Sequence, residues 1–236
     1  MKYLIFFVLF GFLRPLMADQ VSLGLTSRLP TLTGAQVDYT TSGQWRFLYQ
    51  IGFIPEPYAK LIGQAAAQYG GDSSYDDVVE SALENNMMMT FGVEYLFDEV
   101  DGWGLGLGGS YLTSDGTADA QSVLAAATGR DYSTLIALLQ AAGRSTDVDM
   151  KTDLYLLNVY GNYTWVFPNS LSLSFLLGVE WIMQADMSLS TSLPVFESSA
   201  AGQSLLRQSE SDLEDIMTQY GVAPIVGFML RYSFSL

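Results

Sequence analysis

Residues 222–236 read VAPIVGFMLRYSFSL, and the alternation in this stretch decides the fold. Every second residue from Val222 to Leu236 is apolar or aromatic, whereas Gly227, Arg231 and Ser233 lie at positions between them. A period of two residues is typical of a β-strand with one apolar face and one more polar face. Strands of this kind alternate between lipid and lumen in membrane-spanning barrels, so the stretch predicts a strand of such a barrel.

Seven further segments alternate in the same way. In one of them Trp45, Phe47 and Tyr49 are separated by Arg46 and Leu48. Most of the segments reach the length of about 9–11 residues that a tilted strand needs to cross a bilayer. The sequence therefore predicts an all-β transmembrane protein, an eight-stranded antiparallel up-and-down β-barrel. The expected strands are 20–28, 32–41, 44–54, 87–97, 102–113, 149–166, 170–188 and 222–236.

The connections between these strands alternate in length. Segments 41–43, 98–102 and 167–170 carry the Gly, Asp, Asn, Pro and Ser residues of tight turns. The other connections are a modest loop at Pro30 and three long loops, at about 55–86, 114–148 and 189–220. Short turns on the periplasmic side and long loops outside are typical of outer-membrane barrels. An even number of strands then leaves both termini on the periplasmic side.

The three long loops have the composition of helices rather than of polar coil. Ser74 followed by early acids is a helix start, and Gly129 and Gly143 are typical helix stops. We expect helices in 56–85, 117–143 and 198–219. Their apolar faces must be buried against each other, in the barrel mouth or on a partner.

Residues 1–18 have the anatomy of a signal peptide. Lys2 precedes an apolar run at 3–13, and Ala18 offers a cleavage site before Asp19. The run is shorter than the roughly 20 residues of a spanning helix, although an uncleaved anchor is the alternative. We therefore expect export to the outer membrane of a Gram-negative bacterium and a single mature barrel domain at 19–236.

The composition excludes several kinds of chemistry. The chain has no histidine and no cysteine, which removes Ser–His and Cys–His catalysis, disulfides and the usual zinc ligands. We expect no enzymatic activity and no cofactor. The net charge of −15 becomes −17 without the two bases of the leader, a balance that repels nucleic acid and attracts cations. Weak Ca²⁺ binding at Asp72, Asp76 and Asp77 is a minor hypothesis beside ordinary solvated helix-start charges.

Aromatic residues gather near the two ends of the expected strands, as interfacial belts do. The belt expected at the periplasmic end consists of Trp45, Tyr95, Phe97, Trp103, Trp165, Tyr232 and Phe234. A second group near the long loops consists of Phe53, Tyr111, Tyr155 and Trp181.

The inward positions of the strands include charged residues, which a narrow lumen must pair. We expect Arg46 and Glu94 to pair across adjacent strands near the periplasmic end, with Glu180 and Arg231 joining them or lying above. Such a network is either a plug that stabilises the barrel or a gate over a small pore. Polar lumen packing is expected from Gln50, Asn158, Tyr160 and Asn162. The apolar inward residues nearer the long loops are Leu48, Leu154, Leu156 and Ile182.

With these segments the chain resembles the small eight-stranded outer-membrane barrels, the class of the OmpA membrane domain, OmpX and OmpW. The resemblance covers about 20–54, 87–113, 149–188 and 221–236 and is architectural. It implies insertion by the outer-membrane assembly machinery, although such barrels often end in Phe and this chain has Leu236 after Phe234. The likeness to OmpW implies that an apolar upper lumen can admit a small hydrophobic molecule; docking of the loop helices there is the alternative.

Two functions remain at this point. The first is a non-enzymatic barrel whose helical extracellular head serves surface recognition, adhesion or envelope structure. Its partners would be outer-membrane lipid, lipopolysaccharide reached through cations, and an extracellular protein or surface. The alternative is a narrow, porin-like channel for small or hydrophobic solutes.

Overall fold

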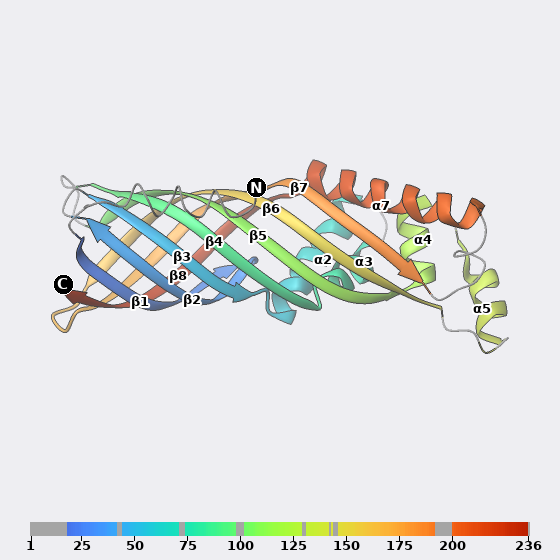
Figure 1. Ribbon diagram of the computed structural model, residues 1–236, viewed down its shortest axis with the longest axis horizontal. Coiled ribbons are helices and arrows are strands. Elements are labelled where there is room, and N and C mark those ends of the chain that lie inside the picture. The colour runs from blue at the N-terminus through green and yellow to red at the C-terminus, as the bar shows by residue number, and fades with distance from the viewer. Residues whose placement is uncertain are drawn as a thin grey trace, which may run out of the picture.

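The computed structural model describes residues 18–41, 44–70, 74–97, 102–128, 131–141, 143, 146–191 and 200–235. Eight antiparallel strands follow one another around a closed barrel, and the last pairs with the first (Figure 1). This confirms the predicted fold class. The strands are β1 Ala18–Leu29, β2 Leu32–Thr41, β3 Trp45–Phe53, β4 Asn85–Leu96, β5 Trp103–Asp119, β6 Asp147–Val166, β7 Leu171–Thr191 and β8 Val222–Ser235.

The long connections contain helices, as expected, and these lie at one end of the long axis of the molecule (Figure 1). The described helices are α2 Glu56–Gly70, α3 Ser74–Ala82, α4 Ala120–Thr128, α5 Ser133–Ala141 and α7 Ala200–Tyr220. Residues 1–17, most of the expected leader, lie outside the described part of the chain.

Three strands extend further than the sequence pattern indicated. β5 continues to Asp119 instead of ending at residue 113, and β6 and β7 reach Asp147 and Thr191. The expected helix start at 117 was therefore wrong by three residues. The alternation continues in these extensions, with Ala118 and Val148 buried, but their outward positions carry Asp, Ser and Thr, and so the segments look like polar loop.

A register shift in the β6–β7 pair marks the transition from barrel to extension. Tyr155 pairs with Gln184 and Leu156 with Ile182, so Met183 has no partner in this register. The inward positions of β7 change there from even to odd numbers, from Glu180 to Ala185. An extra residue in one strand has this effect because side chains alternate strictly between the two faces.

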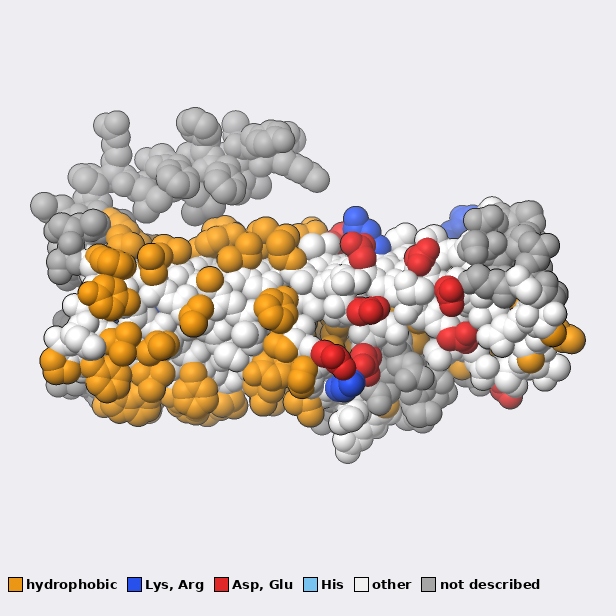
Figure 2. Space-filling model, turned by 90° about the horizontal axis from the view of Figure 1, so that it is seen from below, with side chains coloured by type: hydrophobic (Ala, Val, Ile, Leu, Met, Phe, Trp, Pro, Cys, Tyr) orange, Lys and Arg blue, Asp and Glu red, His pale blue; other side chains and the backbone are white. Residues whose placement is uncertain are grey.

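The outer surface of the eight-stranded part is apolar. Leu25, Phe91 and Phe228 expose 66%, 59% and 54% of their surface, and hydrophobic side chains cover this half of the face seen in Figure 2. Acidic side chains occupy the other half of that face, beyond the band. Water-soluble proteins rarely expose a continuous apolar surface of this extent, because its contact with water is unfavourable. This apolar band around the barrel therefore faces lipid, and the strands span a membrane. No helix in the described part of the chain is long and apolar enough to cross a bilayer.

Aromatic rings pack edge to face at the end of the barrel where the short turns lie. Ring centroids are 5.0 Å apart for Trp45 and Tyr95, and 5.3 Å apart for Trp103 and Tyr163. The other expected belt residues pair nearby: Phe97 with Tyr95, Trp165 with Tyr163, and Tyr232 with Phe234. Their assignment to the periplasmic interface stays a prediction.

Beyond the band, the strand extensions and three helices build a second compact unit. We call this unit the head: residues 113–119, 147–153 and 184–191 of β5, β6 and β7, with α4, α5 and α7. Its hydrophobic core includes Val123, Leu124, Val148, Met187 and Leu213, and α3 contributes Val78 to it. The head therefore has its own packing and is not a set of independent loops.

Candidate functional site

The lower layer of the lumen, near the short turns, holds the first of two ion pairs. Arg46 Nη1 lies 2.8 Å from Glu94 Oε2, and the two residues are direct neighbours across β3 and β4. The hydroxyl of Tyr160 donates to the other oxygen of Glu94 at 3.0 Å. Glu94 is fully buried, and these two contacts satisfy both of its carboxylate oxygens inside the barrel. The pairing expected from the sequence is present.

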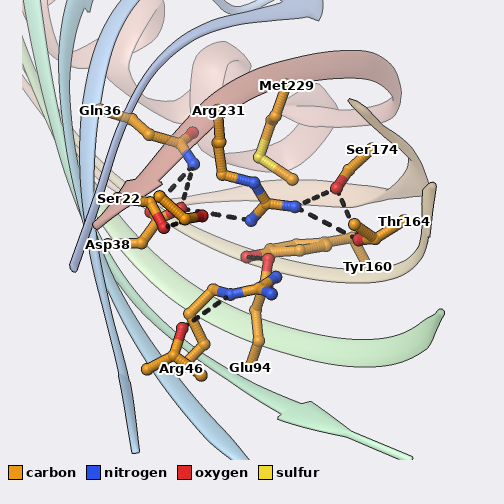
Figure 3. Close-up of polar contacts among 12 residues, drawn as sticks. Ser22, Gln36, Asp38, Arg46, Glu94, Tyr160, Thr164, Ser174, Met229 and Arg231 are labelled. Carbon is orange, nitrogen blue, oxygen red and sulfur yellow. Dashed lines mark hydrogen bonds and ion pairs between the residues drawn. The ribbon is translucent and has the colours of Figure 1, made fainter. Parts of the chain in front are cut away.

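The second ion pair differs from the sequence expectation. Arg231 Nη1 lies 3.2 Å from Asp38 Oδ2, and both side chains are buried. Arg231 Nη2 donates to Thr164 and Ser174 on the opposite side (Figure 3). Arg231 was expected to join the Arg46–Glu94 pair or to lie above it, and its direct ionic partner, Asp38, was not predicted. The signal was in the sequence, because the alternation of Val37 and Tyr39 places Asp38 on the inward face.

A relay of amides completes the lower layer. Gln36 Nε2 donates to both carboxylate oxygens of Asp38, at 2.9 and 2.7 Å. Gln50 Nε2 in turn donates to Gln36 Oε1 at 3.0 Å. Gln50 was predicted as lumen packing. Gln36 was not predicted, although the same alternation that places Asp38 inward also places Gln36 inward. These contacts fix the orientation of the carboxylate that holds Arg231.

Glycines on neighbouring strands make room for the largest lumen side chains. A Cβ at Gly106 would come within 2.3 Å of the Tyr160 ring, and one at Gly24 within 2.9 Å of Arg231 Cγ. These two positions cannot carry a side chain without displacing the network. The ring and the stem of Arg231 therefore pack directly against the backbone of these glycines, which lets a narrow lumen hold both.

The upper layer of the lumen is polar but not directly ion-paired. Arg28 Nη2 donates to Thr90 Oγ1 at 2.9 Å, Thr90 and Ser110 share a hydrogen bond of 2.8 Å, and Asn158 Nδ2 donates to Ser110 at 3.2 Å. Glu180 lies opposite Asn158 in the β6–β7 register. Arg28 was not predicted to face the lumen, although the outward positions of Val21, Leu23 and Leu25 imply that it points inward.

Glu180, expected in the charge network, and Asn162, expected in the polar packing of the lumen, are both buried. Neither carboxylate oxygen of Glu180 has a hydrogen-bond partner among the residues that the structure describes, so Glu180 does not join Arg231. The side-chain amide of Asn162 is buried and likewise has no partner within the described ranges. Of the four expected charges, Arg46 pairs with Glu94, Arg231 pairs with Asp38, and Glu180 has no hydrogen-bond partner among the described residues.

Helices α2 and α3 close the lumen above the polar layers, and we call them the helix cap. Ala59, Val79 and Leu83 of the cap pack in one cluster with inward residues of the strands. Asn86 Nδ2 donates to the carbonyls of Ile54 and Leu83 at 3.0 and 2.7 Å, which ties the end of α3 to the barrel rim. The strand residues of this cluster are Leu32, Met88, Leu112, Leu154 and Ala185, with Leu156 and Ile182 packed against it.

Of the two interpretations of the apolar upper lumen, the structure therefore shows docking of the loop helices. Leu48 belongs to a different cluster, with Tyr160, Leu176, Ile225 and Met229 inside the barrel. Lys60 links the two cap helices, with its Nζ 2.7 Å from Glu56 Oε1 and 3.8 Å from Glu80 Oε1. The hydrogen bond and charge of Lys60 lower the pKa of Glu56.

The outward face of the head is acidic. Asp119 and Asp147 stand directly opposite each other in the β5–β6 register, as do Asp153 and Asp186 in the β6–β7 register. A groove of about 420 Å³ on the same extensions is lined by Asp115, Asp149 and Lys151 together with Asn85 and residues of β5, β6 and β7. Hydrogen bonds hold several of these carboxylates, with Tyr111 donating to Asp153 and Gln184 donating to Asp186. The acids of this face outnumber Lys151, so the face carries a net negative potential.

The metal hypothesis is not tested. Asp72 and the side chains of Asp76 and Asp77 lie outside the described part of the structure. Within the described ranges, no group of three or more acidic side chains is arranged to hold a metal ion.

No protein-family model matches the chain, and no curated protein matches it. Among solved structures, it is similar to the N-terminal β-barrel domain of OprF from Pseudomonas aeruginosa, with 8% identity and a TM-score of 0.44 over 92% of this chain and 98% of that one. It is also similar to a major outer membrane protein from Thermus thermophilus, with 13% identity and a TM-score of 0.43 over 91% and 99% of the two chains. The strand pairing and the apolar band define the class of this protein, which is a small eight-stranded transmembrane β-barrel.

Proposed function

We propose that this protein is a non-enzymatic barrel of the bacterial outer membrane that holds a rigid extracellular head, and that the head recognises a cationic partner. The observation that carries the proposal is the separate hydrophobic core of the head, beyond the apolar band. Recognition residues commonly lie on loops that a rigid scaffold positions. Here the scaffold itself continues out of the membrane as three long strands.

The construction of the head supports a role that needs a fixed shape. β7 continues past the start of β8, so residues 183–191 would present an unpaired strand edge. Helix α7 lies along this edge, and the carboxylates of Glu210 and Glu214 accept hydrogen bonds from the backbone N–H groups of Leu189 and Met187. On the other side of the extension, the end of α3 lies against β5 beyond the last β4 pair, so closely that a Cβ at Gly116 would collide with the carbonyl oxygen of Ser81. Covered edges keep a sheet from uncontrolled pairing, so binding is left to its face.

The chemistry of the partner follows from the acidic outward face. Side chains of Asp115, Asp149 and Asp186 are exposed there. A cationic surface would offset the repulsion between the opposed aspartates and would be drawn in by the field of the face. Lipopolysaccharide reached through bridging cations would be a neighbour in the membrane, and the assembly machinery would insert the barrel.

The packed lumen argues against the narrow-channel alternative. Two ion-paired or hydrogen-bonded layers fill the barrel, and the helix cap packs over them. An eight-stranded barrel has an interior just wide enough for its own side chains. In planar bilayers we expect no steady single-channel steps, whereas regular steps at moderate voltage would favour the channel.

A binding assay with charge variants tests the proposal. The probe is a lysine-rich peptide of about 20 residues, titrated onto the protein in lipid nanodiscs. Replacing Asp149→Asn together with Asp186→Asn should weaken binding about tenfold at low salt, because both residues lie on the acidic face. The matched control, Asp131→Asn with Asp215→Asn, removes the same charge elsewhere on the exposed surface. Equal loss in both variants would mean that net charge, and not this face, governs binding.

A further inference from the structure

The upper layer of the lumen contains two buried charges that make no ion pair with any residue the structure describes. Arg28 is 1% exposed and Glu180 is 2% exposed. The lower layer is different, because Arg46 and Arg231 each contact a carboxylate directly. An isolated buried charge is costly, so Arg28 and Glu180 need a compensating partner that the direct contacts do not supply.

The lumen charges are balanced only when these two residues are counted together. Arg28, Arg46 and Arg231 are the lumen cations, and Asp38, Glu94 and Glu180 are the lumen anions. Two of the cations are matched to two of the anions by contact. The remaining cation and anion lie in the same upper layer, so no outside ion is required for neutrality.

A chain of hydrogen bonds runs from Arg28 towards Glu180 but does not reach it. It passes through Thr90 and Ser110 to Asn158, whose strand neighbour in register is Glu180. Several atoms along this path are buried and have no protein partner among the described residues. They are Arg28 Nε, Asn158 Oδ1 and both carboxylate oxygens of Glu180.

Such a group of atoms is suited to bound water. Buried water typically makes about three hydrogen bonds to buried polar groups that would otherwise be unsatisfied. Water can donate to the acceptors of Glu180 and Asn158 and accept from Arg28 Nε, which no side chain in the layer does. The apolar helix cap above and the ion-paired layer below separate these atoms from both ends of the barrel.

We propose that the upper lumen layer is a hydration site, in which bound water joins Arg28 to Glu180 as a third, solvent-separated charge pair. The site takes water and needs no metal or organic ligand. The carboxylate of Glu180 would thus be bound through water, whereas that of Asp38 is bound directly by Arg231 and Gln36.

The first test is water-edited NMR of the wild-type protein in lipid bilayers, with the carboxyl carbons of Glu and Asp labelled. The signal of Glu180 is assigned from its loss in Glu180→Gln and that of Asp38 from its loss in Asp38→Asn. We expect water magnetisation to reach the Glu180 carboxyl several times faster than the Asp38 carboxyl. Equal, slow transfer to both groups would overturn the hydration site.

The second test is a double-mutant cycle on the unfolding equilibrium, with Arg28→Met and Glu180→Gln. Each single change leaves one buried charge unmatched, and the double change removes both. We expect the double variant to be more stable than the sum of the single effects predicts, by a coupling on the order of tenfold in the unfolding constant. Additive effects would show that the two residues do not form a pair. Where Arg28→Met does not fold, the NMR comparison, which does not use that variant, still decides the question.

Discussion

Glu210 on α7 accepts a hydrogen bond from the backbone N–H of Leu189 on β7, at 2.8 Å. One turn further along the helix, Glu214 accepts from the N–H of Met187 at 2.7 Å. Met187 and Leu189 are two residues apart along β7, whereas Glu210 and Glu214 are four residues apart along α7. One turn of the helix therefore matches the spacing between successive N–H groups at this edge of the strand. The helix thus supplies the acceptors that a longer β8 would otherwise provide.

Replacing both carboxylates by alanine should loosen this edge. We expect Glu210→Ala with Glu214→Ala to cost roughly 1–3 kcal/mol of head stability, because two charge-assisted hydrogen bonds to backbone N–H groups are lost. Hydrogen exchange at the amides of Met187 and Leu189 should become faster, while exchange at the lumen strands below stays unchanged. Asp215→Asn, on the exposed side of α7, is the control. Unchanged protection in the double variant would show that α7 is held by its apolar contacts alone.

Gly106 and Gly109 offer a matched pair on one strand. A Cβ at Gly106 would lie 2.3 Å from the Tyr160 ring, whereas the nearest atom to a Cβ at Gly109 is 3.9 Å away. Gly106→Ala should therefore displace the ring from Glu94 and destabilise the barrel by about 1–3 kcal/mol, as overpacking does. Gly109→Ala should be close to neutral. Urea unfolding in detergent, followed by the gel shift of folded barrel, measures both, and similar midpoints would contradict the packing.

The two ion pairs should differ in sensitivity. Arg231 and Asp38 are almost wholly buried, whereas the side chain of Arg46 is 13% exposed. Asp38→Asn leaves the Arg231 guanidinium without its counter-charge and should cost about 3–5 kcal/mol. Arg46→Met should cost less, because water can approach Glu94 from that end. Unfolding midpoints that rank the two variants the other way would refute this order.

The sequence predicted the barrel because alternation along a spanning strand is a local property. It also predicted the Arg46–Glu94 pair, since both residues lie at inward positions a few residues from the short-turn ends of adjacent strands. The pairing of Arg231 with Asp38 crosses β1, which lies between β8 and β2. That contact depends on barrel closure and on the absence of a side chain at Gly24, neither of which alternation reveals.

The head was predicted only in part for a different reason. Its helices follow from caps and apolar spacing, but the strands that carry them alternate between buried apolar residues and exposed Asp, Ser and Thr, which resembles a polar loop. The Met183 irregularity in β7 then shifts the inward face by one residue. Sequence spacing alone could not place Met187 and Leu189 in the core of the head.

The helix cap gives a last prediction, which concerns whether α2 and α3 belong to the core or to the surface. Leu83 is buried against Met88 and Leu112 in the barrel mouth, whereas Leu138 on α5 is 65% exposed. Leu83→Ala should lower stability by about 2–5 kcal/mol through lost burial and a residual cavity, while Leu138→Ala should change little. The unfolding midpoint in urea measures both variants, each compared with the wild-type protein in the same detergent. Should Leu83→Ala leave the midpoint unchanged, the cap would be a loosely held recognition loop, and the closure of the lumen would depend on the two polar layers alone.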